Sequence, residues 1–175
     1  LRALGFETIV ATDLDRNGSG EIIVVQGGVP PKLRVFGKNG QLLWSAPLGN
    51  GAVPGGNIGM PSVADIDNDG REEIVACMPD FLTYDSLRVF AFHSDGTNVA
   101  GFPVTIAMDF QPTVAIADVD IDGFKDIVVQ GNGGTPRSSS PSQVNSLVAT
   151  TTRVWSTSST STARKRLVGR SIRRA

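Results

Sequence analysis

The sequence has few of the residues on which enzymes and disulfide-stabilised domains depend. Its 175 residues include one cysteine, one histidine and one tyrosine, and aromatic residues make up 6%. The single cysteine, Cys77, excludes an internal disulfide framework, and a single histidine, His93, is a poor basis for a Ser-His-Asp triad. No apolar run approaches the roughly 18 residues that a membrane helix needs, so we expect no membrane span.

Acidic residues are absent from the last part of the chain. Residues 137–175 hold 8 of the 16 basic residues, 16 Ser or Thr and no Asp or Glu, whereas residues 1–136 hold all 17 acidic residues. A break this sharp separates two kinds of polypeptide. We therefore expect a folded part over 1–136 and an irregular basic tail over 137–175. The tail is interpreted as out of frame or disordered; a nucleic-acid-binding arm is the alternative that we least expect.

Three ten-residue segments repeat at nearly constant spacing. They begin at Asp13, Asp65 and Asp118, which are 52 and 53 residues apart. Each has acidic residues at positions 1, 3 and 9, Asp or Asn at position 5, Gly at position 6 and Ile at position 10. Short apolar segments rich in β-branched residues flank each repeat on both sides, which predicts a buried strand before and after it.

Two further segments predict an outer hairpin in each of the first two repeats. Residues 33–36 and 87–90 have the same sequence, Leu-Arg-Val-Phe, and each precedes a tight-turn dipeptide, Asn39-Gly40 or Asp95-Gly96. One repeat is thus four antiparallel strands, and helical periodicity is absent. Four strands in about 50 residues predict an all-β fold, a partial β-propeller of two to three blades over 1–136. Because a ring needs at least four blades, we expect the chain to be part of a longer protein that holds the remaining blades, or else an open wedge with exposed edges.

The acidic repeats have the composition of metal-binding loops. Carboxylates at alternate positions of a tight loop repel one another unless a cation neutralises them, and Ca²⁺ takes six to eight oxygen ligands. The loop differs from an EF-hand, because position 12 is apolar and strands flank it. We expect up to three structural calcium ions. The candidate ligands are Asp13, Asp15, Asn17, Glu21, Asp65, Asp67, Asp69, Glu73, Asp118, Asp120, Asp122 and Asp126.

These twelve residues, with the hairpin over 88–96, give the chain a resemblance to the FG-GAP/VCBS repeat family, the calcium-binding propeller blades of integrin α-subunit heads and many bacterial surface proteins. The resemblance covers residues 1 to about 134 and implies secretion or surface display, although no signal peptide is visible. It implies a non-enzymatic adhesion scaffold that binds a protein or glycan at its loop face. The alternative is part of a propeller polysaccharide lyase, similar to rhamnogalacturonan lyases, whose catalytic residues lie outside this sequence.

The remaining polar and aromatic residues do not indicate catalysis. His93 precedes a hairpin turn, so we expect an exposed histidine there. Trp44 is interpreted as a residue that packs in the core or between blades, and Cys77 as a small buried apolar group. We assign no catalytic residue and no organic cofactor.

Overall fold

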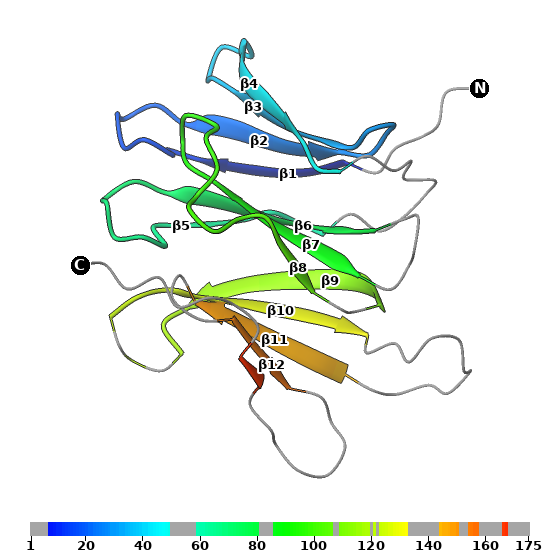
Figure 1. Ribbon diagram of the computed structural model, residues 1–175. Helices are drawn as coiled ribbons and strands as arrows, with labels where there is room; N and C mark the ends of the chain where they lie inside the picture. Colours follow the sequence, from blue (N-terminus) through cyan, green and yellow to red (C-terminus); the bar gives the residue numbers. More distant parts are fainter. Residues whose placement is uncertain are drawn as a thin grey trace.

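The computed structural model is all-β. It describes residues 7–49, 59–80, 86–106, 109–119, 121, 123–132, 144–150, 154–157 and 166–167. These residues form three antiparallel sheets of four, four and five strands, stacked face to face (Figure 1). No helix among them is long and apolar enough to cross a membrane.

Each sheet is a meander in which consecutive strands pair. The first sheet contains β1 (Glu7–Thr12), β2 (Glu21–Gln26), β3 (Lys32–Phe36) and β4 (Leu42–Pro47). The second contains β5 (Ser62–Ala64), β6 (Glu73–Pro79), β7 (Leu87–Phe92) and β8 (Val104–Ile106). The third contains β9 (Asp109–Ala117), β10 (Asp126–Asn132), β11 (Val144–Thr150), β12 (Val154–Thr157) and β13 (Arg166–Leu167).

The strands predicted around the acidic repeats are confirmed. In every sheet the repeat connects the first two strands, and the duplicated Leu-Arg-Val-Phe segments form most of β3 and β7. The turns at Asn39-Gly40 and Asp95-Gly96 follow these two strands, with Gly40 and Gly96 at φ values of 78° and 86°. Such left-handed conformations favour glycine, which explains the dipeptides.

The expectation of an irregular tail from residue 137 is wrong for three segments. Strands β11, β12 and β13 lie in this part of the chain, and β11 pairs with β10 over seven residue pairs, from Asp126–Thr150 to Asn132–Val144. Composition misled the prediction, because Val and Thr favour strands even in a basic, serine-rich context. An unpaired β10 edge also offers backbone donors and acceptors that a further strand satisfies. The rest of the tail lies outside the described residues.

Equivalent repeat positions face the same neighbour at the interface between the first and second sheets and at that between the second and third. Residues at repeat position 10, Ile74 and Ile127, pack against the preceding sheet, whereas those at position 11, Ile23 and Val75, pack against the following sheet. All seven residues of β6 are therefore buried, as expected for a strand covered on both sides. Cys77 belongs to this strand and is 1% exposed, which confirms the prediction of a buried thiol.

Trp44 connects the first two sheets. Its indole Nε1–H donates to the carbonyl oxygen of Ser94 at 2.8 Å, and its ring lies 5.9 Å from that of Phe92. The prediction of a residue that packs between sheets is thus confirmed. The ring also lies directly against Gly96, where an added Cβ would come within 2.8 Å of Trp44 Cδ2.

Gly96→Ala is expected to destabilise the protein more than Gly40→Ala does. Both glycines have positive φ, but a Cβ at Gly40 meets nothing within 4 Å. Both variants bear the backbone strain, and only Gly96→Ala displaces Trp44, which adds at least about 1 kcal/mol. Urea unfolding of the two variants measures the difference. Equal losses would show that the hairpin does not pack on Trp44.

Candidate metal centre

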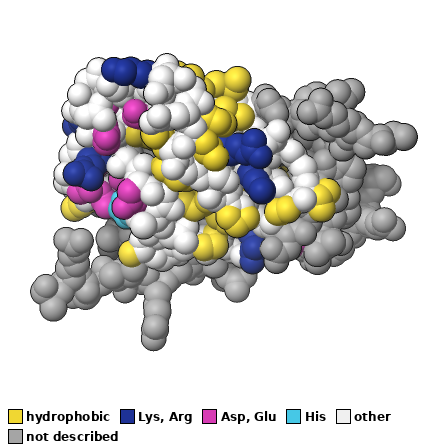
Figure 2. Space-filling model, turned by 90° about the horizontal axis from the view of Figure 1, so that it is seen from above, with side chains coloured by type: hydrophobic (Ala, Val, Ile, Leu, Met, Phe, Trp, Pro, Cys, Tyr) yellow, Lys and Arg dark blue, Asp and Glu magenta, His cyan; other side chains and the backbone are white. Residues whose placement is uncertain are grey.

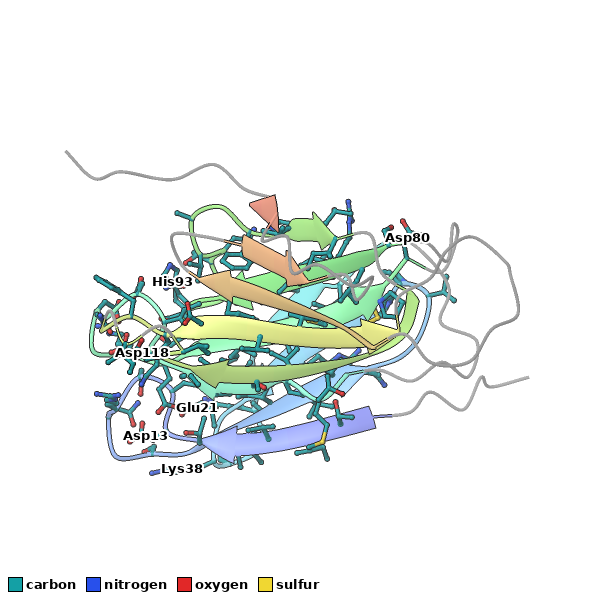
Figure 3. The ribbon with its side chains drawn as sticks, turned by 90° about the horizontal axis from the view of Figure 1, so that it is seen from below. Asp13, Glu21, Lys38, Asp80, His93 and Asp118 are labelled. Atoms are coloured by element: carbon teal, nitrogen blue, oxygen red, sulfur yellow. The ribbon has the colours of Figure 1, made fainter. Side chains whose placement is uncertain are left out.

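The three acidic loops lie at one end of the stacked sheets. Each joins the first two strands of its sheet, and all three project from the left side of Figure 1. In Figure 3 the labelled Asp13, Glu21, His93 and Asp118 lie together at this end, whereas Asp80 lies at the opposite end. The antiparallel meanders thus bring together segments that are about 50 residues apart in the chain.

Neighbouring loops also contact each other directly. Thr12 Oγ1 donates to Glu72 Oε2 at 2.9 Å, and the Glu72 amide donates to the Leu14 carbonyl at 3.0 Å, which links the first loop to the second. Asn68 Nδ2 donates to the Gly123 carbonyl at 3.2 Å, which links the second loop to the third. These hydrogen bonds hold each loop against its neighbour.

All three loops follow the same unusual backbone path. The residue at position 4 is left-handed although it is not glycine, and the glycine at position 6 is left-handed as well. The φ values at position 4 are 56° for Arg16, 61° for Asn68 and 60° for Ile121; those at position 6 are 85° for Gly18, 89° for Gly70 and 91° for Gly123. A left-handed residue other than glycine costs roughly 1–2 kcal/mol, so the loop contacts must compensate for this cost three times.

The carboxylate at position 1 holds the turn closed. Its Oδ2 accepts a hydrogen bond from the amide of the position-6 glycine. The distances are 2.8 Å for Gly18 to Asp13, 3.1 Å for Gly70 to Asp65 and 3.0 Å for Gly123 to Asp118. The other oxygen of Asp65, Oδ1, is buried and has no hydrogen-bond partner. A buried carboxylate oxygen without a hydrogen-bond partner lowers the stability of the fold, and a bound cation would supply the missing partner.

The carboxylate at position 9 is buried in all three loops. Glu21, Glu73 and Asp126 are 7%, 0% and 1% exposed. Each accepts a hydrogen bond from the amide of position 2: Leu14 to Glu21 at 3.0 Å, Ile66 to Glu73 at 2.8 Å and Val119 to Asp126 at 2.8 Å. Burial is the main cause that raises the pKa of Glu73, and the neighbouring Asp67 and Asp69 raise it further. A bound cation would remove this penalty.

At the first loop, which we call site 1, three predicted ligands converge. One oxygen each of Asp13, Asp15 and Glu21 lie within 4.8 Å of one another. Asn17 contacts this group, because its Nδ2 donates to Asp15 Oδ2 at 2.8 Å, and its Oδ1 accepts from the Ser19 amide. The chemistry of this donor set is hard oxygen, as Ca²⁺ requires.

At the second loop, site 2, four groups converge. Oxygens of Asp67, Asp69 and Glu73 and one ring nitrogen of His93 lie within 4.8 Å of one another. His93 Nδ1 is 3.3 Å from Glu73 Oε1 and 4.0 Å from Asp67 Oδ2. Asp65 is not among these four residues; its Oδ2 accepts the hydrogen bond that closes the turn.

The expectation that His93 is an exposed hairpin residue is wrong. Its side chain is 29% exposed and faces the loop of its own sheet. The reason is the strand register: Ile74 pairs with Phe92, so the next residues, Glu73 and His93, face each other across β6 and β7. No local motif in the sequence marks this contact, because it depends on how β6 and β7 pair.

The third loop, site 3, is described in part. Asp118 and Asp126 make the same two backbone hydrogen bonds as their counterparts at sites 1 and 2. Asp120 and Asp122 were also predicted as ligands and lie outside the described residues. The shared hydrogen bonds show that this loop closes in the same way.

Negative charge dominates the loop end of the molecule. Seen from above, acidic side chains gather at that end next to the histidine, with Lys or Arg side chains beside them, whereas hydrophobic and further basic side chains are scattered over the rest of the face (Figure 2). Lys38 lies beside the first loop and donates to Ser19 Oγ at 3.2 Å. Groups of carboxylates at this spacing can hold a metal ion at sites 1 and 2.

Comparison with protein-family models, with curated proteins and with solved structures finds no match to this chain.

Proposed function

We propose that the chain is a segment of a calcium-binding β-propeller of the FG-GAP/VCBS type, in which each sheet is one blade. The observation that carries the proposal is the threefold recurrence of one loop. Position 9 is buried, position 1 holds the position-6 amide, and positions 4 and 6 are left-handed in each copy. Three independent acidic turns have no reason to share all of these features.

The ion has a structural role in this proposal. Asp13, Asp15 and Glu21 would hold Ca²⁺ at site 1, and Asp67, Asp69 and Glu73 would hold it at site 2. Asp118, Asp126, Asp120 and Asp122 would supply the ligands of site 3. When bound, the cation supplies positive charge that offsets the repulsion among these carboxylates. Because each loop joins the first two strands of a sheet, the ion fixes the strand connection and the face on which a ligand docks.

In this proposal the chain is a non-enzymatic binding or adhesion scaffold within a larger secreted or surface protein. The sheets stack through one repeated interface, so further blades extend the same pattern. The loops gather at one end, where a protein or glycan would bind. Extracellular calcium modules work at roughly 10⁻⁴–10⁻³ M affinity, which suits an extracellular site.

A polysaccharide lyase is the competing function. Incubation of the full-length protein that contains this chain with pectic polysaccharides, followed by ultraviolet absorbance of unsaturated products, separates the two proposals. Binding of glycan or protein without turnover supports the scaffold. Calcium-dependent turnover would contradict the scaffold proposal and support the lyase.

Asp65→Asn is expected to weaken calcium at site 2 at least about tenfold and to leave site 1 nearly unchanged. The substitution removes the charge of the carboxylate whose Oδ1 is buried without a partner. Isothermal titration with Ca²⁺ measures the affinities, and Asp80→Asn, at the opposite end of the molecule, is the matched control. An unchanged isotherm for Asp65→Asn would contradict a calcium site at this loop.

A further inference from the structure

One residue distinguishes the second loop from the first. In the second sheet Ile74 pairs with Phe92, which places His93 opposite Glu73. In the first sheet Ile22 pairs with Phe36 in the same way, which places Gly37 opposite Glu21. The turn hydrogen bonds agree, because the amide of Gly40 donates to the Gly37 carbonyl as that of Gly96 does to the His93 carbonyl. The third sheet has Thr150 at the corresponding register, opposite Asp126. Of the three loops, only the second has an imidazole at this position.

One pair of donor atoms at site 2 has the spacing of two ligands on one small ion. Two donors about 2.1 Å from a tetrahedral ion lie about 3.4 Å apart. His93 Nδ1 and Glu73 Oε1 lie 3.3 Å apart and form a hydrogen bond, which a bound cation would replace. The four candidate donor atoms lie within 4.8 Å of one another, so binding of one ion would draw the other donors closer together.

The chemistry of this donor set differs from that of site 1. Ca²⁺ binds oxygen and has little use for an imidazole, whereas imidazole suits Zn²⁺ and other first-row transition ions. Three carboxylates with one imidazole form a mixed site, and affinity rises along the transition series for nitrogen-containing sites. Site 1 has oxygen donors alone, from Asp13, Asp15 and Glu21.

Two further observations support a bound cation here. Asp65 Oδ1 is buried beside the loop without a hydrogen-bond partner. Glu73 is fully buried on the strand β6, so its position is fixed by the core on both sides. Glu73 lies on β6 and His93 directly follows β7, so two paired strands position these two ligands as a transition-metal site needs.

We propose that site 2, formed by Asp67, Asp69, Glu73 and His93, binds a first-row transition cation such as Zn²⁺ more tightly than Ca²⁺, whereas site 1, which has no imidazole, prefers Ca²⁺. This inference rests on the proposed metal-binding function of the loops. It makes the second blade chemically distinct from its neighbours. His93 is the residue that determines the selectivity.

Nuclear magnetic resonance tests the proposal directly, because His93 is the only histidine in the chain. The full 175-residue protein, without a polyhistidine tag, gives one imidazole signal pair. At fixed pH, stoichiometric Zn²⁺ is expected to shift the Nδ1 resonance of the ring to that of a metal-bound nitrogen. Ca²⁺ is expected to leave it at the position of an uncoordinated imidazole.

Two variants give the matched affinity test. His93→Gln retains an amide that can donate to Glu73 but removes the nitrogen ligand, and it is expected to lower Zn²⁺ affinity by at least about 10- to 100-fold. Gly37→His places an imidazole opposite Glu21, where an added Cβ meets only side-chain atoms, none closer than 3.4 Å. The Gly37→His variant is expected to bind a second Zn²⁺ ion tightly, at site 1. Isothermal titration with Zn²⁺ and with Ca²⁺ measures both, and circular dichroism verifies that each variant is folded.

The outcomes separate this inference from the function on which it rests. A Zn²⁺-dependent shift of Nδ1, with weaker Zn²⁺ binding by His93→Gln, supports the mixed site. Calcium binding at both loops with no Zn²⁺ effect on the ring overturns the selectivity and leaves the calcium scaffold standing. Absence of binding by either ion overturns both. If His93→Gln does not fold, an unshifted Nδ1 resonance in the unmodified protein is sufficient to reject the inference.

Discussion

Glu73→Gln is expected to change stability in opposite directions with and without bound metal. In the metal-free protein Glu73 is fully buried, and burial raises the pKa of its carboxyl group. Folding therefore disfavours the ionised carboxylate of Glu73 at pH 7. Gln is neutral and its side-chain oxygen still accepts a hydrogen bond from the Ile66 amide, so we expect Glu73→Gln to increase the free energy of unfolding. With a saturating cation the same variant loses a ligand. At 100 times the dissociation constant the metal contributes about 2.7 kcal/mol, most of which the variant should lose.

The pH dependence of the metal-free protein gives the sign of this effect. Because the pKa of Glu73 is raised above its ordinary value of 4.5, the folded state binds more protons than the unfolded state between the two pKa values. Stability from this group is complete below pH 4.5 and is lost as pH rises through the raised pKa. Urea unfolding of metal-stripped protein, with Glu73→Gln as the reference, measures it. Parallel pH profiles for the two proteins would contradict the buried, disfavoured carboxylate.

Leu33→Ala is expected to lower the free energy of unfolding by about 2–5 kcal/mol. Leu33 is 0% exposed and lies in the cluster that joins the first sheet to the second, so the variant leaves a cavity between them. Leu42→Ala is the matched control, because Leu42 is 53% exposed on the same sheet and should change stability by no more than about 0.5 kcal/mol. Chemical unfolding monitored by Trp fluorescence measures both. A small loss for Leu33→Ala would show that the two sheets do not share a core.

Much of the fold follows from local pattern in the sequence. The β-branched segments around each acidic repeat, such as the one that becomes β2, are short and bounded by turn residues, so local chemistry is sufficient to predict them. The positions of Gly40 and Gly96 were equally predictable, since tight turns require left-handed residues. The loop closure by Asp65 and its counterparts follows from the repeat.

The features that escaped prediction depend on pairing between strands. His93 reaches Glu73 only because Ile74 pairs with Phe92, and register is a tertiary property that composition does not contain. The strands β11 and β12 were missed because a basic, serine-rich composition was weighed above the demand of β10 for a partner. The identity of the ion depends on which side chains converge. That follows from the sequence only once the register is known.

Thermal unfolding of the 175-residue protein against free Ca²⁺ tests the central claim most directly. A cation that binds only the folded state must stabilise it in proportion to the logarithm of its concentration once the site is saturated. We expect the Tm to rise steadily with Ca²⁺ from roughly 10⁻⁴ M upward and to return to the metal-free value on addition of EGTA. A Tm that stays the same across the titration and with EGTA would contradict the account, because the buried carboxylates of Glu21, Glu73 and Asp126 would then need no cation.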